Sequence, residues 1–127
     1  MLWPVSVKAV ILDDHGRALL GRNDREEWEL LGGRLDAGES PEEAVVREVD
    51  EEAGLEIAPV TLLRSWVFSP LPGTAVLIIS YGCLLRPGRV RLSDEHEAVA
   101  FHTPEQLGRI ALPSGYRTDI ELWRERR

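Results

Sequence analysis

Three glutamates, Glu48, Glu51 and Glu52, stand at positions i, i+3 and i+4 of one stretch of the sequence. On a helix these positions fall within an arc of roughly 100°, so the three carboxylates would crowd one face. Like charges at these spacings destabilise an exposed helix by roughly 0.2–0.5 kcal/mol per pair. Such a face is either simply solvated, as acidic runs usually are, or binds a hard divalent cation through oxygen ligands. The glutamates alone do not decide between these two interpretations.

The residues around these glutamates carry the start and stop signals of a helix. Ser40 is a good N-cap residue, Pro41 suits the first helical position, and Glu43 stands three residues after the cap. Gly54 suits the left-handed conformation that ends many helices, so the sequence predicts a helix that ends at about Ala53. Four apolar residues centre on a face beside the acidic one and predict packing on a sheet: Val45, Val46, Val49 and Ala53.

The spacing of residues from Gly33 to Leu55 resembles the Nudix box. Gly33 is followed after five residues by Glu39, and seven residues later by the run from Arg47 to Leu55, so every defined position of the box is filled. The resemblance implies a Nudix hydrolase, a magnesium- or manganese-dependent enzyme that cleaves a nucleoside diphosphate linked to another group. The box covers residues 33–55, and a weaker resemblance in the order of strands and helices covers most of the chain.

The resemblance also implies a set of site residues. Glu48, Glu51 and Glu52 would bind one to three Mg²⁺ or Mn²⁺ ions, together with the carbonyl oxygen of Gly32 and with Glu95. A glutamate would then take the proton of the attacking water, and Glu48, Glu52 and Glu95 all remain open for that role. All three glutamates of the box are therefore expected to be catalytic.

Two further residues of the box are expected to hold the ligands in position. The resemblance pairs Glu39 with Arg47, which would also orient Glu48 and so contribute to catalysis. The ordinary alternative is an exposed ion pair that adds little stability.

The resemblance places one further expected metal ligand, Glu95, in the acidic loop before the strand predicted at Ala98–Phe101. Glu95 lies six residues before Phe101, the spacing at which Nudix proteins often place one more metal-binding glutamate. Asp94 and Glu97 are competing choices, and a plain acidic loop is the other interpretation.

The lead-in from Trp28 to Gly33 departs from the family pattern at one position. Leu31 stands where Nudix proteins commonly have proline, which leaves a backbone donor in place. Gly32 and Gly33 predict a tight turn that brings a carbonyl oxygen close to the cation.

Two aromatic residues, Trp66 and Phe68, are candidates for contact with the base or sugar of a nucleotide, although a core role is the stronger expectation. Pro70 stands about fifteen residues past the box, where a proline marks many ADP-ribose hydrolases. A proline in this loop is more often only a turn former, so the substrate stays open.

The rest of the chain predicts a mixed sheet with helices on both sides. Val5–Leu12 and Arg17–Arg22 are expected to form a hairpin around Asp13, and two longer apolar runs, at 59–68 and 74–85, form a second antiparallel pair. A short helix is expected at 103–106 and a final one at 116–124. This pattern predicts an α/β/α sandwich, which is also the Nudix fold, in a single domain of residues 1–127.

The net charge and the composition of the chain limit the kinds of partner and the cellular location that we expect. The net charge of −7 disfavours a bare nucleic acid, which needs basic patches, whereas metal ions can bridge an acidic protein to an anionic pyrophosphate. The single cysteine, Cys83, is compatible with a reducing compartment, and we expect it to be a buried strand residue. No apolar run has transmembrane length and no signal peptide is visible, so a cytoplasmic location without membrane association is expected.

Two other functions are compatible with the same motif. One is a catalytically inactive domain that senses nucleotides. The presence of Glu48, Glu51 and Glu52 argues against this alternative. The other is a different enzyme on the same fold, such as an isomerase or an RNA-decapping enzyme, and the acidic chain disfavours the latter. The oligomeric state is open, with a homodimer as one option.

Overall fold

The protein is described here by a computed structural model, which covers residues 3–87 and 98–127. In these residues the chain forms, in order, β1 (Val5–Ile11), β2 (Ala18–Arg22), β3 (Trp28–Glu29), β4 (Leu31–Arg34), α1 (Pro41–Ala53), β5 (Ile57–Phe68), β6 (Val76–Leu85), β7 (Ala98–His102), α2 (Pro104–Leu107) and α3 (Ser114–Glu125). None of the described helices is long and apolar enough to cross a membrane.

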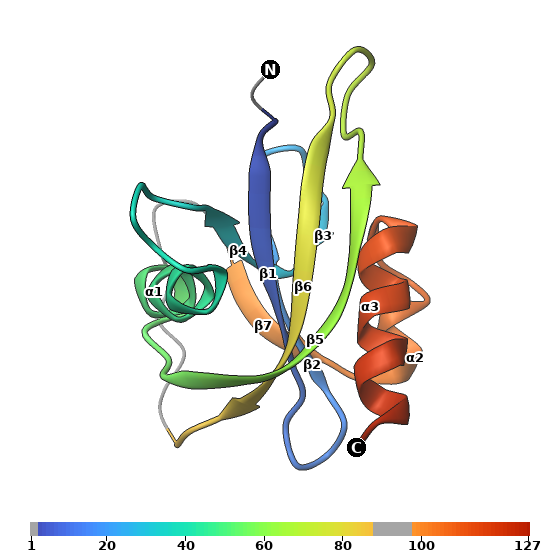
Figure 1. Cartoon of the computed structure of the whole chain (residues 1–127). Helices are drawn as coiled ribbons and strands as arrows, with labels where there is room; N and C mark the ends of the chain where they lie inside the picture. The colour runs from blue at the N-terminus through green and yellow to red at the C-terminus, as the bar shows by residue number, and fades with distance from the viewer. Residues whose placement is uncertain (1–2, 88–97) are drawn as a thin grey trace.

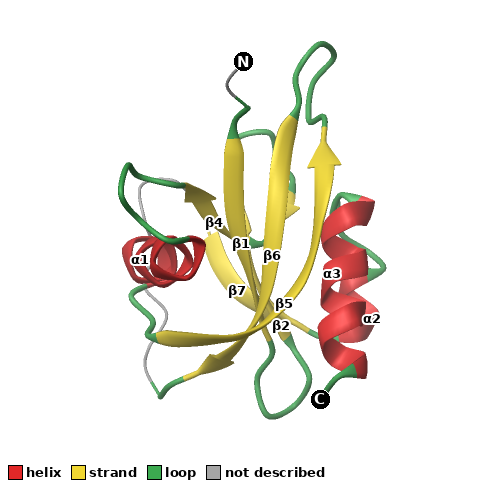
Figure 2. Cartoon of the chain, in the orientation of Figure 1, coloured by secondary structure: helices red, strands yellow, loops and turns green. Residues whose placement is uncertain are grey.

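The strands divide between two sheets with helices on both sides (Figure 1). The larger sheet has the order β4-β1-β6-β5, in which β1 and β6 run parallel and the other pairs antiparallel. The smaller sheet has the antiparallel order β3-β2-β7. Figure 2 shows α1 on one side of the strands, with α2 and α3 on the other. The predicted α/β fold with a mixed sheet is therefore confirmed, with the addition of a second sheet.

The predicted hairpin between the first two strands is wrong. The turn itself forms, because Oδ1 of Asp13 accepts hydrogen bonds from the backbone N–H groups of His15 and Arg17. Only a single bridge, between Leu12 and Ala18, joins the two strands beyond it. Strand β1 then pairs with β4 and β6, and β2 pairs with β3 and β7, so both edges of β1 are taken by other partners.

The tight turn expected at the two glycines is also wrong. Gly32 and Gly33 lie within β4, where they pair with Lys8 and Val7 of β1. Gly32 has a φ of 151°, and a Cβ atom at this position would lie 1.9 Å from the carbonyl oxygen of Val7. A glycine is needed at Gly32 because β4 approaches β1 so closely there, not because the chain turns.

The other predicted elements are confirmed with small shifts of their ends. The second antiparallel pair is β5 with β6, and α3 begins two residues earlier than expected, at Ser114. Thr103 caps α2 with both hydrogen bonds of a capping box.

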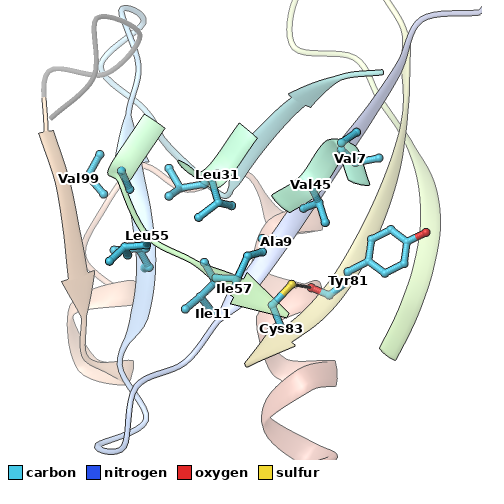
Figure 3. Packing of buried hydrophobic residues seen from close by; sticks show 14 residues of the cluster. Val7, Ala9, Ile11, Leu31, Val45, Leu55, Ile57, Tyr81, Cys83 and Val99 are labelled. Carbon is cyan, nitrogen blue, oxygen red and sulfur yellow. Dashed lines mark hydrogen bonds between the residues drawn. The ribbon is translucent and has the colours of Figure 1, made fainter. Parts of the chain in front are cut away.

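The core has two parts because β1 buries both of its faces. One part lies between the sheets and α1, as Figure 3 shows, and includes Val7, Ala9, Ile11 and the buried Cys83. The other part lies against α3 and includes Val10, Tyr116 and Trp123. This alternation along one strand fixes which β1 residues face α1 and which face α3.

Candidate functional site

Helix α1 carries the candidate site, and its ends are set by local sequence. Oγ of Ser40 accepts from the backbone N–H of Glu43, and Oε1 of Glu43 accepts from the backbone N–H of Ser40. Gly54 ends the helix in the left-handed conformation, with φ of 68°. Ala44, Val45, Val49 and Ala53 are fully buried, which fixes the rotation of the helix on the sheet. Glu48 and Glu52 therefore turn toward the protein, at 8% and 2% exposure.

The carboxylates of Glu48 and Glu52 meet adjacent residues of β4. Oε1 of Glu52 accepts a hydrogen bond from the backbone N–H of Gly32 at 2.8 Å. A Cβ atom added to Gly33 would lie 2.6–2.8 Å from the carboxylate atoms of Glu48, so only glycine leaves room for that carboxylate. Gly32 thus binds the Glu52 carboxylate through its backbone, and Gly33 leaves room for the Glu48 carboxylate beside it.

Arg47 connects the carboxylates on the outer side of α1. Its Nε and Nη2 donate to the two carboxylate oxygens of Glu39, at 2.6 and 3.0 Å. Its Nη1 donates to Oε1 of Glu48 at 3.0 Å and contacts both carboxylate oxygens of Glu51, at 3.2 and 3.3 Å. Nη2 also reaches the carbonyl oxygen of Arg34 at 3.2 Å. One guanidinium therefore balances part of the charge that three carboxylates bring together.

These contacts shift the ionisation of Glu39. The hydrogen bonds from Arg47, together with one from the backbone N–H of Asp36, lower the pKa of Glu39 to about 2. The same pairing raises the pKa of Arg47, with Glu39 as the largest cause. Both groups are charged at neutral pH.

The donor set fits a hard divalent cation in its chemistry. Among residues 3–87 and 98–127, no three His, Cys, Asp or Glu side chains converge closely enough to hold a metal ion in the present arrangement. Glu48 and Glu52 nevertheless bring two buried carboxylates to adjacent residues of β4, and carboxylate oxygens are the ligands that hard divalent cations prefer. The Glu51 side chain is 55% exposed, and its carboxylate contacts the same Nη1 of Arg47 that donates to Glu48, so a third carboxylate lies beside the same guanidinium.

Other residues expected at the site lie elsewhere or outside the described residues. Glu95, with the competing Asp94 and Glu97, lies outside them. The structure gives the N–H of Gly32 a role toward Glu52, and the carbonyl of Gly32 stays a proposed ligand.

Trp66 and Phe68 lie on β5 and pack half-buried against the core beneath α3. Both rings lie edge-on to the Tyr116 ring, with centroids 5.3 and 5.4 Å away. Nε1 of Trp66 donates to Oδ2 of the buried Asp119 at 2.9 Å. Trp66 and Phe68 therefore both pack against the core, as expected, and their contact with a substrate stays a prediction.

Sequence reasoning missed a buried charge near the site. Lys8 is 7% exposed on β1, and its Nζ donates to the carbonyl oxygen of Leu30 at 3.0 Å and lies 3.7 Å from Oε2 of Glu29. Burial acts to lower the pKa of Lys8, but electrostatic interactions with Tyr116 and with the carboxylates of Glu29, Glu52 and Glu48 outweigh burial and raise this pKa overall. The signal in the sequence was a lysine that interrupts an apolar strand.

Comparison with known proteins shows where the chain belongs. A family model described as the NUDIX domain matches residues 2–122. A MutT-like protein from Streptomyces ambofaciens is 36% identical over 107 residues, which cover 84% of this chain and 68% of that protein. The crystal structure of a MutT protein from Methanosarcina mazei Go1 superposes with a TM-score of 0.83 at 30% identity, covering 98% of this chain and 94% of that one.

An ADP-ribose pyrophosphatase from Streptococcus suis superposes with a TM-score of 0.76 at 25% identity, covering 98% of this chain and 91% of that one. The family model spans nearly the whole chain and includes all the box residues on α1 and β4. This chain belongs to the Nudix family of hydrolases.

Proposed function

We propose that the protein hydrolyses the pyrophosphate bond of a nucleoside diphosphate linked to another group, with Mg²⁺ or Mn²⁺ as cofactor. Nucleoside triphosphates, ADP-ribose and nucleotide sugars belong to this substrate class. One observation carries the proposal: the buried carboxylates of Glu48 and Glu52 meet at adjacent glycines of β4. Family membership supports it, as does the name of the Streptococcus suis neighbour, an ADP-ribose pyrophosphatase.

We assign metal binding and ligand positioning to different residues of the site. Glu48 and Glu52 would hold the cation, with Glu51, the carbonyl of Gly32 and Glu95 as further proposed ligands. The bound cation would neutralise charge on the pyrophosphate oxygens and lower the pKa of the attacking water. Arg47 would hold Glu48 in position through its 3.0 Å hydrogen bond.

Hydrolysis also requires a base. As the water oxygen bonds to phosphorus, a glutamate takes its proton and the bond from phosphorus to the leaving oxygen breaks. Glu48, Glu52 and Glu95 remain the three candidates for this base. The base should leave an acidic limb in the pH–rate profile, and that limb should vanish when the correct glutamate is replaced by glutamine.

The test is a hydrolysis assay of purified protein with pyrophosphate-containing nucleotides, with product identification. We expect turnover in Mg²⁺ or Mn²⁺, none after exhaustive chelation with EDTA, and recovery when the metal is returned. Full activity after chelation would contradict the metal mechanism. Binding of nucleotides without any turnover would instead favour the inactive nucleotide-sensing domain.

A further inference from the structure

The chain crosses from the smaller sheet to the larger one through a single residue. Strand β3 ends at Glu29 and pairs with β2, whereas β4 begins at Leu31 and pairs with β1. Between them, Leu30 is fully buried in the part of the core that lies against α3, and Leu31 packs in the part that lies against α1. A shift of this crossing would therefore move the start of β4, where the candidate metal site begins.

Lys8 of β1 reaches this crossing with a buried ammonium group. Its Nζ donates to the carbonyl oxygen of Leu30 at 3.0 Å and lies 3.7 Å from Oε2 of Glu29. Both charged side chains are mostly buried, so these contacts form in a region of low dielectric, where they are stronger than in water. One side chain of the larger sheet thus holds both the last residue of β3 and the residue that joins β3 to β4.

The same crossing leads directly to the backbone group that holds Glu52. Gly32 is the β4 partner of Lys8, and the two strands lie so close that a Cβ atom on Gly32 would be 2.9 Å from the Cα atom of Lys8. The N–H of Gly32 donates to Oε1 of Glu52 at 2.8 Å. Lys8 therefore restrains β4 twice, through its backbone at Gly32 and through its side chain two residues earlier, at Leu30.

The burial of this lysine is better explained by position than by stability. An apolar side chain on β1 would avoid the cost of taking an ammonium out of water. Buried ion pairs often stabilise a fold no better than apolar residues of similar size, and in some proteins they are retained because they fix one arrangement of the chain. The arrangement that Lys8 contacts is the crossing from β3 to β4.

We propose that Lys8 is a positioning residue for the metal site: by holding Leu30, it fixes Gly32 where the Gly32 N–H keeps the Glu52 carboxylate in place for metal binding. The inference rests on the proposed function, because it requires Glu52 to be a metal ligand. Lys8 contacts neither the cation nor the reacting atoms in this proposal and acts only through Gly32 and Glu52.

The experiment measures the Gly32 amide and metal binding without any nucleotide. Lys8→Met replaces the ammonium by an apolar group of similar length. In protein labelled with ¹⁵N-glycine, NMR gives the hydrogen-exchange rate of the Gly32 amide relative to that of Gly82, a buried glycine of β6. Titration with Mn²⁺, followed by electron paramagnetic resonance, gives the Kd for the metal.

The matched control is Arg64→Met, which removes another cation from the same face of the larger sheet. Lys8 pairs with Ser80 of β6, and Ser80 pairs with Arg64 of β5. The Arg64 guanidinium donates to Asp119 and Gly115, so its loss weakens the packing of α3. This control therefore reports what a general loss of stability does to the Gly32 amide and to metal binding.

We expect Lys8→Met to raise the relative exchange rate of the Gly32 amide by about 10-fold, because the local opening of β4 becomes easier. The Kd for Mn²⁺ should rise by about 10-fold, at the lower end of what the loss of a ligand-positioning contact costs. Arg64→Met should lower the melting temperature but change both quantities by less than about twofold, because it lies at the other end of the sheet.

Thermal unfolding checks that each variant is folded. If Lys8→Met is not, the double variant Lys8→Met with Glu29→Met takes its place, because replacing both members of a buried ion pair by apolar residues is often neutral for stability. Failure of both variants to fold would make Lys8 a structural residue and overturn the inference.

A folded variant in which either the relative exchange of Gly32 or the Kd for Mn²⁺ is unchanged would overturn the inference, because the proposal links the two. Equal effects of Lys8→Met and Arg64→Met would mean a general loss of stability and would overturn it as well. Mn²⁺ binding that weakens in Glu52→Gln but not in Lys8→Met would overturn this inference alone. A wild type that binds no Mn²⁺ would count against the proposed metal site itself.

Discussion

The backbone N–H of Gly32 donates a hydrogen bond to Oε1 of Glu52 at 2.8 Å, across 20 positions of sequence. This bond joins β4 to α1 at the point where the candidate metal ligands gather. The position of the Glu52 carboxylate is therefore set by a strand as well as by its own helix. The two predictions that follow separate the charge of Glu52 from the geometry of Gly32.

Replacing Glu52 by glutamine should remove activity without unfolding the protein. Oε1 of the glutamine can still accept from the N–H of Gly32, so the link between β4 and α1 survives. The lost charge should lower kcat by about a thousandfold, equivalent to about 4 kcal/mol of transition-state stabilisation. Asp50→Asn removes a charge from the exposed side of the same helix and should leave kcat within about twofold. Similar kinetics for the two variants would exclude Glu52 as a ligand.

Gly32→Ala should destabilise the fold, whereas Gly38→Ala should cost much less. Both glycines have positive φ, at 151° and 82°. A methyl group at Gly32 would also collide with the carbonyl oxygen of Val7 at 1.9 Å, whereas nothing lies within 4 Å at Gly38. We expect losses of about 3 kcal/mol or more at Gly32 and about 1 kcal/mol at Gly38. Urea unfolding measures both, and equal losses would mean that strand contact at Gly32 is unimportant.

Arg47→Met should make the protein more dependent on metal for its stability. Removal of the guanidinium leaves the carboxylates of Glu39, Glu48 and Glu51 without their shared counter-ion. The melting temperature without metal should fall, and Mg²⁺ should raise it by more than in wild type, because the cation relieves the same repulsion. Activity at saturating Mg²⁺ should fall by about 10- to 100-fold.

The control for Arg47→Met is Arg25→Met, which removes a cation from an exposed ion pair with Glu27. Its melting temperature and its response to Mg²⁺ should match those of wild type. An Arg47 variant that responds to Mg²⁺ no more than this control would show that carboxylate repulsion is unimportant.

Helix α1 could be predicted from sequence because all of its determinants are local. Ser40 and Gly54 mark its ends within a few residues, and the box spacing assigns Glu48 and Glu52 to one helix. Strand pairing was less predictable. A turn signal at Asp13 shows that the chain reverses, but not that β1 will pair with β6, about 70 residues away.

The polar neighbours of the site depend on contacts between distant segments. Arg64 and Asp119 are 55 positions apart in sequence, and no local pattern connects them. Lys8 was visible as an exception in an apolar strand, but its relation to Glu29 depends on the pairing of β1 with β4. Gly32 is a similar case. The sequence alone could not show whether this glycine lies in a strand or in a turn, because that depends on its pairing with Lys8 of β1.

Glu39 should stabilise the native state above about pH 4.5 and lose this effect as the pH falls toward 2. Its pKa is about 2 in the folded protein and close to the ordinary 4.5 when unfolded, so the unfolded state binds its proton first on acidification. The free energy of unfolding should therefore differ between wild type and Glu39→Gln at pH 6, and the difference should shrink between pH 4.5 and pH 2. A difference that is constant over this range would mean that the Arg47 pairing does not depend on the charge of Glu39.

Asp119 should be a main stabilising contact between α3 and β5. Its fully buried carboxylate accepts from Nε of Arg64 at 2.6 Å and from Nε1 of Trp66 at 2.9 Å. Asp119→Ala leaves both donors without this acceptor, and because Arg64 is 29% exposed, water should offset part of the loss. We expect about 2–3 kcal/mol of destabilisation, somewhat below the cost of breaking a fully buried pair.

Asp119→Asn keeps one carbonyl oxygen as an acceptor, so it should cost less than Asp119→Ala but more than the exposed control Asp50→Ala. Urea unfolding followed by tryptophan fluorescence ranks the three variants. If Asp119→Ala and Asp50→Ala agree within about 0.5 kcal/mol, Asp119 does not hold α3 on the sheet. The proposed order would instead show that the Asp119 carboxylate, through Arg64 and Trp66, stabilises the packing of α3 on β5.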